Sequence, residues 1–249
     1  MTTTPPASYP ARLNGRLDAP LSRWLWLVKW LLAIPHFIVL AFLWLAFFVL
    51  TVLAFFAILF TGRYPRAIFA FNVGVIRWNW RVLFYAVDCF GTDQYPPFSL
   101  RPDPSYPADF EVDYPERLSR GLVLVKWWLL AIPQLIIVSI LSGGWGFGVN
   151  NGWRVAGGGG LIAVLSIIAG FILLFTREYP RSIFDLVMGL NRWVYRVLVY
   201  VALMRDEYPP FRLDPGGSDP GQPTVQPWPR LGPTAAPQPT SPPPEPVRQ

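Results

Sequence analysis

The sequence is poor in charged residues. They make up 14% of its 249 residues, whereas a soluble domain of this length carries roughly a quarter. Between Trp24 and Phe60 the single charged residue is Lys29. Apolar runs of this length exceed the ~20 residues that cross a bilayer. The composition therefore excludes a soluble two-domain protein and predicts an all-α integral membrane protein.

Cysteine and histidine are almost absent. Cys89 is the single cysteine, which excludes an internal disulfide and a cysteine-based metal site. His36 is the single histidine, and its counterpart in a second copy of the pattern, described next, is Gln134. We therefore expect His36 to be a structural polar residue rather than a ligand or proton carrier. No nucleophile–base pair or metal set recurs in both copies, so the sequence predicts no enzyme, cofactor or metal.

Several motifs occur twice, in the same order. "FTGRYPRAIF" from residue 60 matches "FTREYPRSIF" from residue 175, and "RWNWRVLFY" from residue 77 matches "RWVYRVLVY" from residue 192. "TDQYPPFSL" and "RDEYPPFRL" follow them. The chain is therefore an internal duplication. We expect a disordered N-terminus at 1–8, membrane repeats at 9–104 and 105–215, and a disordered Pro-rich tail at 216–249.

The apolar run of the first repeat is too long for one straight span. Trp24 to Phe60 would form a helix of about 55 Å, against a bilayer core of ~30 Å. The interpretation that we favour is a transmembrane hairpin that turns near Leu45–Val49. The competing arrangement has an interfacial helix to Ile34, followed by one span from Pro35 to Phe60.

The second repeat carries a Gly-rich insertion at Ser142–Gly160, which divides its apolar run into segments at about Leu122–Leu141 and Leu161–Phe175. Of the 21 lysines and arginines, only Arg154 lies in this insertion. Basic residues flank each apolar unit on both sides, which predicts an even number of crossings. We expect a multi-pass protein with both termini in the cytoplasm and the insertion outside.

Each repeat then continues with an apolar helix that carries a stripe of arginines. On a helix over Pro65–Asp88 the stripe contains Arg66, Arg77 and Arg81, and in the second repeat it contains Arg181, Arg192 and Arg196. This pattern favours an amphipathic helix in the membrane interface whose arginines bind lipid phosphates. The alternative is a helix that crosses the bilayer, with arginines lining a polar pathway. "ARLNGRL" and "DFEVDY" alternate weakly, which allows a short strand in each repeat.

A resemblance to a known family adds to this interpretation. "LVKWLLAIPHFIVL", "FAILFTGRYPRAIFAFNVGVIRWNWRVLFYA" and "TDQYPPFSL" resemble the bacterial membrane family catalogued as domain of unknown function 4389. The resemblance covers about Tyr9–Leu100 and Tyr106–Leu213. The second repeat departs from it at Arg177, at Val194–Tyr195 and through its insertion. The resemblance implies a bacterial inner membrane location, and it supplies no activity and no site residue.

Together these features predict a tandem repeat, each unit a transmembrane helical hairpin plus an interfacial amphipathic helix. The leading functional hypothesis is a non-enzymatic scaffold or accessory protein of the bacterial cytoplasmic membrane. The alternative is a small-solute or lipid carrier that uses the paired arginine stripes. We expect anionic lipid and an unidentified protein as partners. Nucleic acid is not expected, because no folded basic domain is present to read bases.

Overall fold

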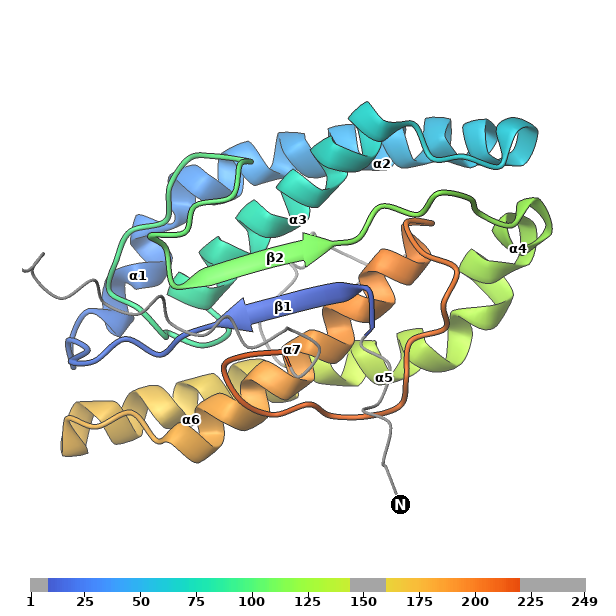
Figure 1. The fold of residues 1–249 in the computed structure, drawn as a ribbon. Coiled ribbons are helices and arrows are strands. Elements are labelled where there is room, and N and C mark those ends of the chain that lie inside the picture. The colour runs from blue at the N-terminus through green and yellow to red at the C-terminus, as the bar shows by residue number, and fades with distance from the viewer. Residues whose placement is uncertain (1–8, 144–159, 220–249) are drawn as a thin grey trace, which may run out of the picture.

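The computed structural model describes residues 9–143 and 160–219, which are mostly helical (Figure 1). The predicted disordered N-terminus at 1–8 and most of the predicted disordered tail at 216–249 lie outside the described residues, as does most of the predicted insertion loop. In chain order the elements are β1 (Ala11–Gly15), α1 (Trp26–Leu32), α2 (Ile34–Thr61), α3 (Arg66–Ala86), β2 (Ala108–Val112), α4 (Arg120–Val125), the π-helical segment η1 (Lys126–Leu130), α5 (Ile132–Ser142), α6 (Leu161–Thr176) and α7 (Arg181–Val201).

The two strands form a small antiparallel sheet in which Leu13 lies opposite Phe110. The short strands predicted from the sequence are therefore confirmed, and the all-α prediction is corrected. Each strand packs on the helix of the other repeat: β1, from the first repeat, lies on α7, and β2, from the second, lies on α3. The strands have thus been exchanged between the repeats, and neither repeat is complete without the other.

The elements form three layers. The sheet lies on α3 and α7, and these helices pack in turn on α2 and on α5 and α6 (Figure 1). Alternate strand residues, including Leu13 and Phe110, are buried against the middle layer, whereas Arg12 and Glu111 point away from it and are partly exposed. One face of the molecule is therefore polar, and apolar helices form the opposite face.

Helix α2 is one continuous helix of 28 residues, or about 42 Å. The predicted turn near Leu45–Val49, and with it the hairpin in the first repeat, is therefore wrong. This stretch contains neither glycine nor proline, and nothing in it terminates a helix. The helix ends instead at Gly62, whose φ of 70° supplies the left-handed cap. The competing arrangement, which ended the first helix at Ile34, is closer to the structure, where α1 ends at Leu32 and α2 begins at Ile34.

Helix α6 continues the course of α5 and does not turn back beside it (Figure 1). α7 packs against α6, its Trp193 bonds to Gln134 of α5, and its Tyr200 lies against Lys126 of η1. Together α5 and α6 thus take the place that α2 has in the first repeat. The predicted hairpin of the second repeat is also wrong, because α5 and α6 follow one path and do not lie side by side as antiparallel helices (Figure 1).

The arginine helix expected over Pro65–Asp88 is α3, at Arg66–Ala86, and α7 carries the corresponding arginines of the second repeat. α3 begins after Pro65, and α7 begins after Pro180. Both prolines have extended backbone angles, with ψ of 125° and 110°. The Tyr-Pro pairs therefore position the start of each helix, as the restricted backbone before and at proline predicts.

Candidate functional sites: buried arginine clusters and an exposed apolar surface

Arg77 and Arg81 of α3 point into the protein, toward β2. The Asp109 carboxylate accepts ion pairs from both: Oδ1 lies 2.9 Å from Arg77 Nε and 3.3 Å from Arg81 Nη2. Arg81 also donates to the backbone oxygen of Arg101 at 3.0 Å, and its side chain is fully buried. One carboxylate and several main-chain oxygens thus balance two guanidinium groups beneath the sheet.

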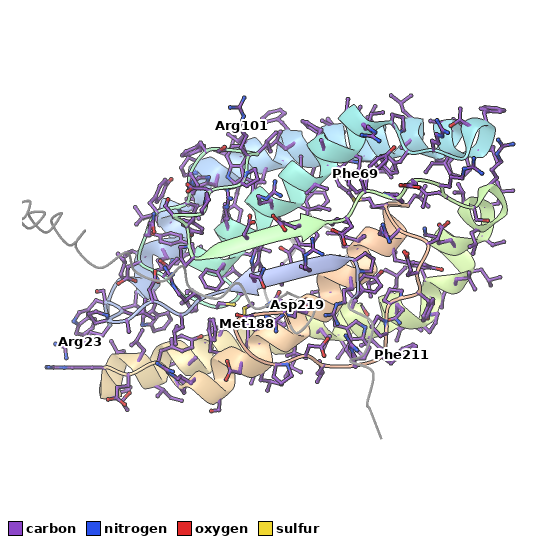
Figure 2. All side chains as sticks on the ribbon, in the orientation of Figure 1. Arg23, Phe69, Arg101, Met188, Phe211 and Asp219 are labelled. Carbon is purple, nitrogen blue, oxygen red and sulfur yellow. The ribbon has the colours of Figure 1, made fainter. Side chains whose placement is uncertain are left out.

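Arg192 and Arg196 of α7 form the corresponding cluster in the second repeat. Arg192 Nε donates to the backbone oxygen of Leu13 in β1 at 3.0 Å. Arg196 donates to Asp214 at 2.6 Å and to Asp219 at 3.1 Å. Asp219 is itself buried and lies near the centre of the molecule (Figure 2). The arginines of this cluster therefore form structural contacts that join three segments of the chain: α7, β1 and the segment that follows α7.

The exchange between repeats extends to the tyrosines that begin them. The guanidinium carbon of Arg81 lies 5.9 Å from the ring of Tyr106, and that of Arg196 lies 5.7 Å from the ring of Tyr9. Each Tyr-Pro-Ala motif therefore caps the arginine cluster of the other repeat, and cation–π contact adds to the ion pairs.

Four of the six stripe arginines, Arg77, Arg81, Arg192 and Arg196, thus face the interior, which corrects the prediction that these four face lipid headgroups. The guanidinium groups of such a stripe can donate to carboxylates and backbone carbonyls as well as to lipid phosphates. Here the exchanged strands supply the Asp109 carboxylate and the Leu13 carbonyl. Arg66 and Arg181, at the first turns of α3 and α7, are exposed. Lipid binding by these two remains a prediction.

The acids that complete the clusters were missed in the sequence. Asp109 follows the second Tyr-Pro-Ala motif, and Arg12 occupies the matching position in the first repeat. The second cluster therefore takes its carboxylates from Asp214 and Asp219, while Arg12 pairs with Asp113 at 2.7 Å. The sequence did contain one hint of these acids, because Asp109 and Asp214 each lie next to a repeated motif. The exchange of strands, which decides which acid meets which arginine, leaves no pattern in the sequence.

His36 and Gln134 fill the same structural role. Trp78 Nε1 donates to His36 Nδ1 at 3.0 Å, and Trp193 Nε1 donates to Gln134 Oε1 at 2.7 Å. Phe98 of the first Tyr-Pro-Pro-Phe motif stacks on the His36 ring at 3.9 Å. The ring therefore anchors a tryptophan and a proline-rich clip. Within the described residues no group of three or more His, Cys, Asp or Glu side chains could hold a metal ion.

The helical face opposite the sheet exposes large apolar side chains. On α2, Phe42 is 70% exposed and Phe48 is 67% exposed, and five residues are buried: His36, Leu40, Phe47, Ala54 and Ile58. Exposed apolar residues continue onto α1, α5 and α6. Within 9–143 and 160–219, α2 is the one helix long and apolar enough to cross a membrane, and α5 and α6 are shorter apolar helices. Apolar surface of this extent indicates an interaction with lipid or protein.

The fold and these surfaces define a class: a two-repeat helical protein with exchanged strands, buried arginine clusters and one apolar face. The family described as "Domain of unknown function (DUF4389)" matches this chain at residues 23–99 and 157–212, more than half of its length. The chain belongs to this family. Comparison with curated proteins found no match. Comparison with solved structures also found none.

Proposed function

We propose that this chain is a non-enzymatic scaffold or accessory protein of a membrane, embedded through its apolar helical face and presenting its strand face to water. The observation that carries the proposal is the exposure of α2. Leu45 and Phe48 are both more than 60% exposed although they lie in the middle of a long apolar helix. In water, so many large exposed apolar side chains would favour aggregation, whereas hydrocarbon solvates them without penalty.

The polar face supports the same orientation. Side chains of Glu111 and Asp113 retain about half of their exposure, 47% and 52%, and they surround Arg12. Ionised groups at bilayer depth cost several kcal/mol each. Because the sheet lies on the far side of α3 and α7 from α2, these groups stay in water when the helical face is in lipid.

The arginine clusters do not support the alternative that the protein is a carrier. A carrier would need guanidinium groups that reach a solute, but Arg77, Arg81, Arg192 and Arg196 are buried and each has a carboxylate within ion-pair distance. In a scaffold, the buried and paired arginines would hold the two repeats together as one rigid unit. A bacterial cytoplasmic membrane with both termini inside the cell remains the location that we propose.

The experiment that tests membrane embedding is retention in membranes after an alkaline carbonate wash. The wild type should stay with the membrane pellet. Phe48→Glu places a charge on the lipid-facing side of α2 without touching the core, and it should move a large fraction of the protein to the supernatant. Ser105→Glu adds the same charge at an exposed site in the linker that leads to β2, and it should leave retention unchanged. Release of the wild type, or equal behaviour of the two variants, would refute the proposal.

A further inference from the structure

A shallow hollow of about 500 Å³ lies where the chain enters α1, beside the C-terminal end of α6. It is lined by Pro20, Leu21, Ser22, Arg23, Trp24 and Arg177. The segment before α1 therefore meets the end of a helix that comes from the other repeat. Figure 2 shows Arg23 at this end of the molecule, beside α6.

The lining carries two cationic side chains and no acid. The Arg23 guanidinium carbon lies 5.3 Å from the Trp24 ring. Among the residues that the structure describes, neither Arg23 nor Arg177 has a carboxylate within ion-pair distance. The nearby Asp93 is engaged, since it accepts a hydrogen bond from Ser22 N and pairs with Lys29 at 2.8 Å. The hollow therefore offers guanidinium donors to an anion.

A second hollow provides the contrast. It lies between the segment before α4 and the segment after α7, and its lining includes Glu116, Asp206 and Glu207 beside Arg117 and Arg205. There the carboxylates outnumber the guanidinium groups, and Arg205 is already paired with Glu207 at 2.7 Å. Of these two hollows, the one at Arg23 and Arg177 alone has the charge to attract an anion.

Arg177 holds an unfavourable backbone conformation. It caps α6 in the left-handed region with φ of 64°, where the first repeat has Gly62 with φ of 70°. A side chain in this region is less stable than glycine, because its Cβ crowds the neighbouring backbone. Glycine would fit this conformation more easily, as Gly62 does in the first repeat, so the presence of arginine suggests that its side chain has a role.

Apolar surface continues directly from the hollow. Trp24 is 58% exposed, and Phe175, two residues before Arg177, is 81% exposed. Phe171, one turn earlier in α6, is 50% exposed and contacts Trp26 edge-on at 5.5 Å. A ligand with an anionic head and an apolar chain could thus place its head beside the two arginines and its chain along the neighbouring aromatic side chains.

From these observations we infer that the hollow binds the phosphate of an anionic phospholipid, with Arg23 and Arg177 donating to its oxygens and its acyl chains lying along Phe171 and Phe175. Guanidinium donors fit phosphate oxygens, and aromatic side chains hold their place at headgroup depth. This inference rests on the proposed membrane embedding and adds a specific lipid site to it.

The test uses the full chain in detergent and measures the rise of its melting temperature on titration with phosphatidylglycerol or phosphatidylcholine. The wild type should bind phosphatidylglycerol more tightly. Arg23→Gln and Arg177→Gln should each weaken that binding about five-fold, while Arg101→Gln, which changes an exposed arginine elsewhere (Figure 2), should not. Arg177→Gly is the decisive variant, because it removes the unfavourable φ: its unliganded melting temperature should rise while its phosphatidylglycerol affinity falls.

Three outcomes would overturn the inference. The first is an unchanged preference for phosphatidylglycerol in the Arg23→Gln, Arg177→Gln double variant. The second is a protein that is retained in membranes but shows no preference between the two lipids, which would leave the proposed membrane function standing. The third is equal stabilisation by inorganic phosphate at the same concentration, which would assign the hollow to a free anion. If the protein is not retained in membranes at all, the proposed function itself fails.

Discussion

Arg81 of the first repeat forms its ion pair with Asp109 of the second, and the two are joined at 3.3 Å across the boundary between α3 and β2. The reciprocal contact runs from Arg192 in α7 to the backbone oxygen of Leu13 in β1. Each repeat therefore supplies the strand that satisfies the buried arginine of the other. The arginines that looked like a lipid-binding stripe hold the two halves together.

Removal of Asp109 should destabilise the whole chain. Asp109→Ala leaves Arg77 and Arg81 without their shared carboxylate, and we expect a loss of about 2–3 kcal/mol of unfolding free energy. The measurement is denaturant or thermal unfolding in detergent. Glu111→Gln, two residues along the same strand, changes a 47% exposed partner of Arg12 and should cost less than about 1 kcal/mol. Equal losses in the two variants would mean that the Asp109 pairs contribute no more than a surface contact.

His36 should be replaceable by glutamine. The second repeat already uses Gln134 to accept the hydrogen bond of the equivalent tryptophan, so His36→Gln should retain most of the stability. His36→Leu removes the acceptor, leaves Trp78 Nε1 buried without a partner, and should cost about 1–3 kcal/mol. Unfolding of the two variants side by side tests this. A glutamine variant as unstable as the leucine variant would show that the imidazole has a further role.

Asp88 should make stability depend on pH. It follows α3 and is partly buried, and burial raises the pKa of its carboxyl to about 7 from an ordinary value near 3.8. The folded state therefore favours the protonated form. The stability linked to Asp88 is fully present below pH 4 and is lost as the pH rises toward and through 7.

Asp88→Asn should remove that slope. At pH 8 the variant should be more stable than the wild type, on the order of 2 kcal/mol after allowance for partial exposure, and at pH 4 the two should be alike. Melting curves from pH 4 to pH 8 provide the measurement, with Asp103→Asn as the control at a carboxyl whose pKa is lowered. A wild-type slope that persists in Asp88→Asn would assign the titration to another group.

Local features of the fold could be predicted from the sequence. Backbone restriction at the Tyr-Pro motifs accounts for the starts of α3 and α7, and the alternation in "ARLNGRL" predicted β1. Both signals act within a few residues, where backbone restriction and side-chain period decide the conformation. A break near Ala33 was part of the competing arrangement only, and Pro35, which lies in the first turn of α2, is compatible with it.

The course of α2 and the surroundings of the arginines could not be predicted in the same way. The turn predicted in α2 rested on the length of the apolar run and on the basic residues at both of its ends, and neither feature specifies where a helix ends. A helical projection shows that Arg77 and Arg81 share a stripe, but it does not say what lies opposite. That partner is Asp109, which is brought there by a strand of the other repeat. Contacts of this kind depend on the exchange of strands, which leaves no local pattern.

The central claim is that the helical face lies in lipid while the strand face lies in water. Spin labels at Phe48→Cys on α2 and at Glu111→Cys on β2 test it directly in reconstituted vesicles, because Cys89 is fully buried and should not react. Power-saturation measurements compare collision with oxygen, which concentrates in the bilayer, and with a water-soluble nickel chelate. We predict that oxygen dominates at position 48 and the chelate at position 111. Dominance of the chelate at position 48 would contradict the account.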